Sequence, residues 1–169
     1  MNDLKDKFIL DACCGCRMFW FEKNHPNVLY MDNREIDETT RDNRRIHVAP
    51  DVKADFRSMP FPNDTFRLVV FDPPHLKRAG DKSWLAKKYG KLNPETWKED
   101  IITGFQECFR VLVPGGFVVF KWNEQQIPIT SIIHALPVNP LFGQKKGKTH
   151  WLVYMKPIQK EKDSTHETL

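Results

Sequence analysis

The sequence of 169 residues has no apolar run long enough to cross a membrane. A membrane-spanning helix needs about 20 consecutive apolar residues, and the longest runs here are much shorter. Residues 1–6 also lack the basic segment and apolar core of a signal peptide. We therefore expect no membrane-spanning helix and a cytoplasmic location.

Cysteine is scarce, and the four cysteines do not form the paired Cys-x₂-Cys elements of a zinc site. Cys13, Cys14 and Cys16 are crowded together, while Cys108 stands alone. Cysteines this close in sequence are poor disulfide partners, and cytosolic thiols stay reduced. A metal site would need the three clustered thiolates and a fourth ligand such as His25. We favour the alternative, that a tight turn needs small side chains, and expect no metal.

The net charge is also small. A formal charge of +4 permits a polyanionic partner without requiring one. Hydrophobic residues make up 40% of the chain and charged residues 28%, which is ordinary for a soluble globular protein. The length suits one domain, which we place at residues 1–156, followed by a flexible polar tail at 157–169.

Short apolar runs that lead to an acid recur along the first half of the chain. Runs at 8–12, 28–32, 52–55 and 68–71 predict buried strands, with helical or polar segments between them. Alternating strands and helices imply right-handed crossovers and a mainly parallel sheet. The acids at the strand ends are Asp11, Asp32, Asp55 and Asp72. Ligands of such sheets bind beyond the carboxyl ends of the strands, so these acids predict a ligand-binding edge.

The helices and the last strands are predicted by spacing. A helix opens at 18–21, and the clearest helix begins near Asn93 as its N-cap, with Pro94 at the first helical position and Glu95 in the first turn. Its apolar face comprises Trp97, Ile101, Phe105, Phe109 and Leu112. A strand at 117–122, a weaker helix at 129–136 and a terminal antiparallel hairpin ending at 150–155 follow.

The most informative stretch follows the strand at 68–71 and reads Asp72-Pro73-Pro74-His75. The Asp72 carboxylate and the next backbone carbonyl can accept both N–H bonds of a planar amino group. The two prolines fix the backbone and remove competing N–H donors, and the ring of His75 offers a stacking face. The turn therefore predicts a binding site for an amino group, called here the amine grip.

Three segments, in this order and spacing, resemble the cofactor motifs of class I methyltransferases that use S-adenosylmethionine: Asp11-Ala12-Cys13-Cys14-Gly15-Cys16, Asp32-Asn33 and Asp55-Phe56. The likeness covers roughly residues 7–156 and includes the turn at 110–116. It implies an α/β fold, a single Rossmann-like domain with a mainly parallel seven-stranded sheet, a C-terminal antiparallel hairpin and helices on both faces. It also implies S-adenosylmethionine as the cofactor, with Asp32 at the ribose, Asp55 at the adenine amino group and Phe56 beside the adenine ring.

The chain departs from that family pattern in two places. Cys13 and Arg17 stand where glycines are usual, which leaves Gly15 alone. Arg17 would either reach the methionine carboxylate of the cofactor or point to solvent. Either the cofactor would bind more weakly than in relatives, or the loop would take another path. The helix that usually precedes the first strand is missing, so another segment or a second subunit would complete one wall of the pocket.

The stretch at 72–75 resembles the Asp-Pro-Pro-Tyr motif of methyltransferases that act on exocyclic base amines, chiefly adenine N6. The resemblance implies that Asp72, Pro73, Pro74 and His75 form the catalytic segment, with Asp72 also beside the cofactor. His75 replaces the usual aromatic residue, stacks more weakly and adds a pH dependence. The alternative is that His75 is a turn residue in an enzyme with another substrate.

Basic and aromatic residues alternate directly after this motif. They are Lys77, Arg78, Trp84, Lys87, Lys88 and Tyr89. The mixture suits phosphate contact and base stacking, and we favour nucleic-acid binding over a solvated loop. Two further basic groups, at 41–47 and 145–148, favour neither interpretation. No segment is large enough for target recognition, so specificity would be loose, or the target a structured RNA, or a partner subunit or homodimer would read it.

Three hypotheses follow. The leading one is an enzyme that methylates a base amine of DNA or RNA. The second is a small-molecule or protein methyltransferase with the same cofactor site. The third is a catalytically degenerate methyltransferase fold that binds nucleic acid or a partner.

Overall fold

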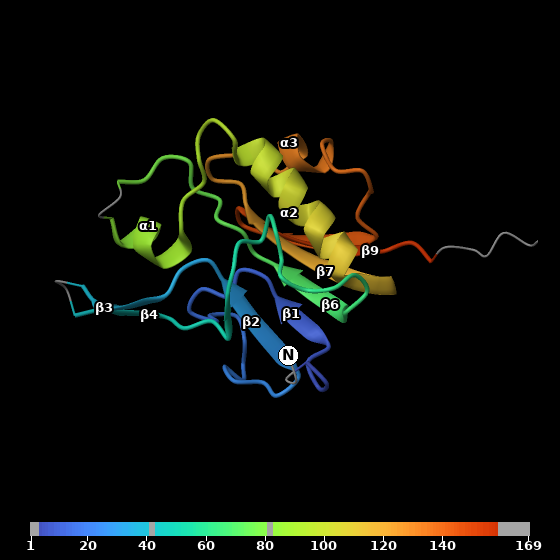
Figure 1. The fold of residues 1–169 in the computed structure, drawn as a ribbon. Coiled ribbons are helices and arrows are strands. Elements are labelled where there is room, and N and C mark those ends of the chain that lie inside the picture. Colours follow the sequence, from blue (N-terminus) through green and yellow to red (C-terminus); the bar gives the residue numbers. More distant parts are fainter. Residues whose placement is uncertain (1–3, 41–42, 81–82, 159–169) are drawn as a thin grey trace, which may run out of the picture.

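The computed structural model describes residues 4–40, 43–80 and 83–158. Their main feature is a seven-stranded sheet of order β5-β2-β1-β6-β7-β9-β8 (Figure 1). The strands are β1 (Ile9–Asp11), β2 (Val28–Asp32), β5 (Val52–Lys53), β6 (Phe66–Phe71), β7 (Leu112–Asn123), β8 (Phe142–Lys146) and β9 (Thr149–Met155). The first five in this list run parallel, and β9 runs antiparallel to both β7 and β8. The predicted parallel sheet with a C-terminal antiparallel hairpin is confirmed.

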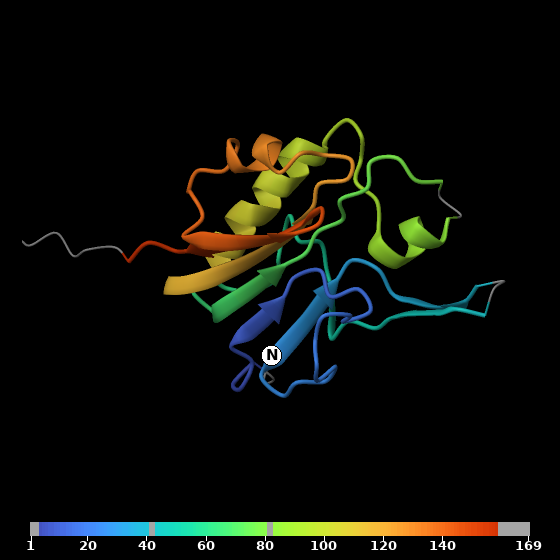
Figure 2. The ribbon, with the colours of Figure 1, turned by 180° about the vertical axis from the view of Figure 1, so that it is seen from behind.

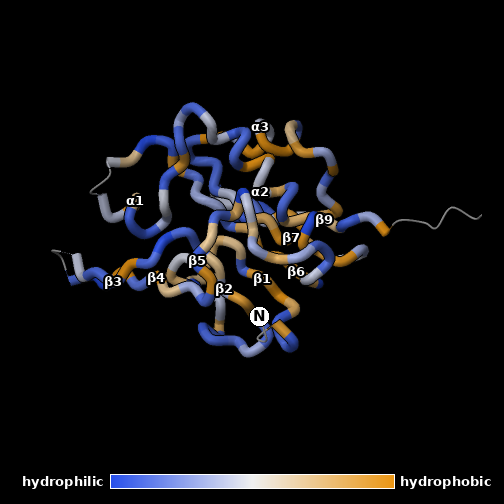
Figure 3. Tube along the Cα trace, viewed as in Figure 1, coloured by the Kyte–Doolittle hydropathy of each residue, from blue (hydrophilic) through white to orange (hydrophobic). Residues whose placement is uncertain are grey.

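Strand β2 shows why the apolar runs form the centre of the sheet. All five of its residues are buried, as expected for a parallel strand that is covered on both faces. Leu29 and Met31 join the main core, while Val28 and Tyr30 pack in a smaller cluster on the other face. Figure 3 shows hydrophobic residues along the inner strands of the sheet.

One face of the sheet is covered by helix α2 (Trp97–Val111), with the short helix α3 (Thr130–Ile133) beside it (Figures 1 and 2). Helix α2 buries Ile101, Phe105, Cys108 and Val111, so its predicted apolar face is confirmed at Ile101 and Phe105. The predicted Trp97 and Phe109 are only partly buried, and Leu112 belongs to β7. It begins later than predicted, because Asn93 caps a preceding turn by accepting a hydrogen bond from the Glu95 N–H at 2.9 Å. Helix α3 covers only part of the predicted 129–136.

The opposite face is covered without a helix in the described residues. The helix predicted to open at 18–21 is wrong, because residues 12–27, called here the turn segment, form successive turns. Arg17 holds them: its guanidinium donates to the carbonyls of Lys23 at 2.8 Å and Ala49 at 2.7 Å, and lies 3.8 Å from the centre of the Tyr30 ring. The expectation of helices on both faces is therefore not confirmed.

Two elements were not predicted. The polar stretch at 33–50 contains a hairpin of β3 (Ile36–Thr39) and β4 (Arg45–Val48), and the basic segment after residue 80 contains α1 (Trp84–Tyr89). An ion pair joins Lys87 to Glu38, and the Arg44 guanidinium lies 4.3 Å from the Trp84 ring. The hairpin and α1, together called the arm, project beyond the carboxyl edge of the sheet (Figure 2).

The described helices are too short and too polar to cross a membrane. The tail predicted at 157–169 lies outside the described residues from position 159 onward.

Candidate active site

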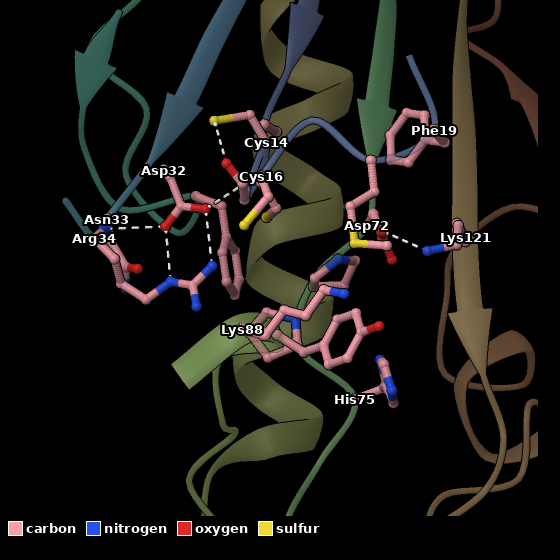
Figure 4. A pocket seen from close by; sticks show the side chains of 18 residues that line it. Cys14, Cys16, Phe19, Asp32, Asn33, Arg34, Asp72, His75, Lys88 and Lys121 are labelled. Atoms are coloured by element: carbon pink, nitrogen blue, oxygen red, sulfur yellow. Dashed lines mark hydrogen bonds and ion pairs between the residues drawn. The ribbon is translucent and has the colours of Figure 1, made fainter. Parts of the chain in front are cut away.

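A cavity of about 300 Å³ lies at the carboxyl ends of β1, β2 and β6 (Figure 4). One wall is formed by residues 12–16 after β1, Asp32 to Arg34 at the end of β2, and Phe56 after β5. Residues 72–75 after β6 form another, with Lys121 of β7 and with Lys88 and Tyr89 of α1. The volume falls within the range of small-molecule sites. The strand order thus brings the predicted cofactor turn and the predicted amine grip into one cavity.

Asp32 joins the turn after β1 to the end of β2. Its Oδ2 accepts hydrogen bonds from the Gly15 N–H at 2.9 Å and from Arg34 Nη2 at 3.1 Å. Its Oδ1 accepts from the Arg34 N–H and from Arg34 Nε, both at 2.9 Å. A carboxylate offers about four lone-pair positions, so these bonds fill all of them. Ribose hydroxyls at Asp32 would therefore compete with the Arg34 guanidinium.

Of the predicted pair Asp55 and Phe56, the structure places only Phe56 in the cavity wall. Phe56 lines the cavity, and its ring lies 5.4 Å from the ring of Phe71. A side chain on Gly104 of α2 would meet Phe56 at 2.4 Å, so the glycine leaves room for this ring. Asp55 does not line the cavity, and its carboxylate pairs with Arg57 at 2.6 Å.

Asp11, a predicted cofactor contact, lies behind the cavity rather than in its wall. Its carboxylate is fully buried and accepts hydrogen bonds from Trp20 Nε1 at 2.7 Å and from the Cys13 N–H at 3.3 Å. Burial raises the pKa of Asp11 to about 7, and the hydrogen bond from Trp20 opposes the rise. Asp11 therefore fixes the turn segment to the end of β1 through its hydrogen bonds with Trp20 and Cys13.

The other predicted residues of the first motif do line the cavity. Ala12, Cys13, Cys14 and Gly15 form the turn, and Gly15 has a positive φ of 47°. Burial raises the pKa of the Cys13 thiol well above its usual value, so this thiol stays protonated. Arg17 meets neither expectation made for it, since it braces the turn segment away from the cavity. No group of side chains suited to a metal ion occurs within the described parts of the chain.

All four residues of the predicted amine grip line the cavity. Asp72 Oδ2 accepts a hydrogen bond from Lys121 Nζ at 2.6 Å, and no described residue donates to its Oδ1. Burial raises the pKa of Asp72, and the Lys121 ammonium opposes the rise. Burial, with Lys121 second, lowers the pKa of His75 to about 4, so its imidazole is neutral at pH 7. The His75 ring lies 6.0 Å from that of Tyr89.

Of the six predicted nucleic-acid contacts, Lys88 and Tyr89 line the cavity. Trp84 and Lys87 belong to the same helix but lie outside the cavity wall. Lys77 and Arg78 lie elsewhere, with both backbone N–H groups donating to Gln126 at 2.8 Å. The structure therefore brings α1 to the cavity and leaves the residues directly after the motif outside it.

Helix α1 is held against the motif by close backbone packing. Gly90, which follows the helix with a φ of 75°, stands where a side chain would meet Pro74 at 2.9 Å. Arg34 Nη1 donates a hydrogen bond to the Lys87 carbonyl at 3.1 Å. The Lys88 ammonium lies 4.4 Å from the Trp84 ring, a cation–π distance.

Five residues that line the cavity were not among the predicted site residues: Cys16, Met18, Phe19, Arg34 and Lys121. Two signals were available. The spacing Asp-x-Arg occurs three times in the sequence. At Asp32 and Arg34 and at Asp55 and Arg57, where the structure describes both residues, the arginine closes back on the acid. Lys121 is the one charged residue in the apolar run 117–122.

No protein-family model matches the chain, and no curated protein matches it. Solved structures share its architecture, among them the following two. The PH0226 protein from Pyrococcus horikoshii OT3 is 14% identical over 88% of this chain and 81% of its own, with a TM-score of 0.54. A candidate S-adenosyl-L-methionine-dependent methyltransferase from Methanococcus maripaludis is 12% identical over 90% and 78%, with a TM-score of 0.51. At such identities the likeness shows the fold alone: the chain shares with these two structures a Rossmann-like fold, with a mainly parallel seven-stranded sheet and an antiparallel hairpin.

Proposed function

We propose that the protein is an S-adenosylmethionine-dependent methyltransferase that acts on an exocyclic base amine, adenine N6 first, in DNA or RNA. The observation that carries the proposal is the shared cavity. Its walls combine the turn 12–16 and Asp32 with Asp72-Pro73-Pro74-His75. The fold shared with a candidate S-adenosyl-L-methionine-dependent methyltransferase supports the cofactor.

The residues that line the cavity fit this cofactor, but Arg34 occupies the carboxylate that would bind its ribose. Phe56 offers an aromatic face for adenine, and the Gly15 turn brings backbone close to a ligand. Asp32 would hold the ribose hydroxyls once Arg34 gives up at least one of its bonds to that carboxylate. When bound, the cofactor supplies an electrophilic methyl group.

Asp72 would act on the amine through the oxygen that Lys121 leaves open. Exocyclic amines are weak nucleophiles because the nitrogen lone pair is delocalised into the base. An N–H bond held by Asp72 Oδ1 and another held by a backbone carbonyl of the motif favour a tetrahedral nitrogen with a directed lone pair. The proton that becomes acidic during transfer would then pass to Asp72 Oδ1.

The arm supports a nucleic-acid substrate. Lys88 and Tyr89 stand at the cavity wall opposite the first motif, and the neutral His75 ring lies beside Tyr89. A base held out of its stack is gripped by aromatic faces, while nearby cations contact phosphates. The arm of this chain offers both kinds of group.

The test is a methyl-transfer assay with labelled S-adenosylmethionine and separate pools of DNA, RNA and metabolites. We expect label in nucleic acid, recovered after digestion as a base methylated on its amine. Asp72→Asn should abolish the label, whereas Asp55→Asn, the matched carboxylate outside the cavity, should keep it. Label confined to metabolites or proteins would overturn the base-amine substrate.

A further inference from the structure

Lys121 is an unusual residue for its position. It lies near the carboxyl end of β7, within the apolar run 117–122, and pairs in register with Trp151 of β9. Its neighbours Phe120 and Trp122 are fully buried in the main core. Because side chains alternate along a strand, Lys121 points to the other face, where it enters the cavity wall.

The ammonium of Lys121 is enclosed by one carboxylate and two aromatic rings. Its Nζ lies 2.6 Å from Asp72 Oδ2, with the two side chains only 25% and 19% exposed. The same atom lies 5.6 Å from the Phe19 ring and 5.7 Å from the Trp151 ring. These two rings contact each other edge to face at 5.5 Å. Cation–π attraction and the ion pair together fix the ammonium in one place.

We propose that Lys121 is a positioning residue, which holds Oδ2 of Asp72 so that Oδ1 faces the substrate, and which keeps the carboxylate ionised as an acceptor. The proposal rests on the proposed amine methylation. It follows from the different surroundings of the two carboxylate oxygens of Asp72: Lys121 donates a hydrogen bond to Oδ2, and no described residue donates to Oδ1. Figure 4 shows Lys121 reaching Asp72 from β7, the strand next to β6.

Other ionisable groups lie near Asp72. Burial first, and the charge of Asp72 as a lesser cause, raise the pKa of Asp11 of β1 and of the Cys13 thiol after β1. His75 of the same turn is neutral at pH 7 and supplies no charge. The cavity wall also carries Asp32, Arg34, Lys88 and Tyr89. Among the described residues, Lys121 is the cation in contact with Asp72.

A second consequence concerns the cofactor turn. Phe19 belongs to the turn segment, which also carries residues 12–16 of the first motif. Its contact with Lys121 and Trp151 therefore connects that segment to β7 and β9. Lys121 thus contacts Asp72 of the predicted catalytic segment and Phe19 of the turn segment, which both line the cavity.

The test compares Lys121→Met with Lys121→Arg. Methionine keeps an unbranched chain between the two rings without a charge, and arginine keeps the charge. An opposite charge within about 4–6 Å lowers a carboxyl pKa by about 1–3 units. In Lys121→Met we therefore expect the titration of the Asp72 carboxyl carbon, followed by NMR, to move up by about 1–3 pH units. The acid limb of the methylation rate should move with it, and Lys121→Arg should restore both.

The matched control is Lys156→Met, since Lys156 pairs with Asp64 at the same 2.6 Å but far from the cavity. It should leave the Asp72 titration unchanged. An unshifted Asp72 titration in folded Lys121→Met would overturn the positioning role. The NMR titration uses protein without substrate, so it measures the effect of Lys121 on the pKa of Asp72 whether or not the protein methylates nucleic acid. A wild-type protein that methylates no nucleic acid would contradict the proposed function alone.

Discussion

Removing the guanidinium of Arg34 should destabilise the protein and at the same time expose Asp32 to a ligand. Arg34 is 23% exposed and Asp32 is 4% exposed, so Arg34→Met leaves a buried carboxylate with the Gly15 and Arg34 backbone N–H groups alone. Breaking a buried pair in this way costs about 3–5 kcal/mol, and the partial exposure of Arg34 reduces the expected loss to about 2–3 kcal/mol. For a domain of this size that is a fall of roughly 4–12 °C in Tm.

Arg57→Met is the matched control, because Arg57 closes on Asp55 with the same Asp-x-Arg geometry at the surface. Arg57 is 47% exposed and pairs with Asp55, which is 35% exposed, and with Asp100 at 2.9 Å. Ion pairs of such an exposed side chain contribute about 0–1 kcal/mol each. Thermal melts should therefore show a clear loss for Arg34→Met and little for Arg57→Met. Equal losses in the two variants would refute the inference that Asp32 depends on Arg34.

The same melts test the competition at Asp32. Arg34→Met frees one lone-pair position on each oxygen of Asp32. Demethylated cofactor, S-adenosylhomocysteine, should then raise the Tm of the variant by more than it raises that of the wild type. A smaller rise in the variant would show that Arg34 assists cofactor binding instead of opposing it.

Three further changes probe the walls of the cavity. Gly104→Ala should weaken S-adenosylhomocysteine binding in calorimetry by about tenfold, because the new methyl group would displace Phe56, whose ring it would meet at 2.4 Å. Gly90→Ala should separate α1 from Pro74 and raise protease cleavage within α1, since it combines a φ of 75° with a 2.9 Å clash. Asp11→Asn keeps an acceptor for Trp20 but cannot ionise. The free energy of unfolding of the wild type should fall by about 3 kcal/mol between pH 4 and pH 7 in urea unfolding, because the pKa of Asp11 rises from 3.8 to about 7 on folding, and that of the variant should not.

The strands that position the site could be predicted because their residues are buried on both faces. The apolar run from Val28 to Asp32 coincides with β2, and the acid at its end marks the cavity edge. Acid-ended strands that are adjacent in the sheet, β1, β2 and β6, converge as the parallel topology requires. Asp55 departs from the pattern because β5 ends two residues earlier, at Lys53.

The turn segment could not be predicted from local pattern. Its apolar residues Phe19 and Trp20 suggested a helix, but they serve distant contacts, with Trp20 donating to Asp11 and Phe19 facing Lys121. The hairpin had a weak signal, since Arg45 and His47 alternate with the buried Ile46 and Val48. The Asp32–Arg34 pair is buried and the Asp55–Arg57 pair is more exposed, although the two have the same sequence spacing. Spacing alone therefore does not predict which pair lies in the cavity.

The most direct test of the site is single-turnover methyl transfer by wild type and Asp72→Asn, with S-adenosylhomocysteine affinity measured on the same samples. We predict that transfer to the base amine falls by about 10²-fold or more, as when a preorganised polar group is removed from an active site. Cofactor affinity should change by less than about threefold, because the cofactor contacts assigned to the turn 12–16 and Asp32 remain. Wild-type transfer by Asp72→Asn would contradict the assignment of Asp72 as the amine acceptor.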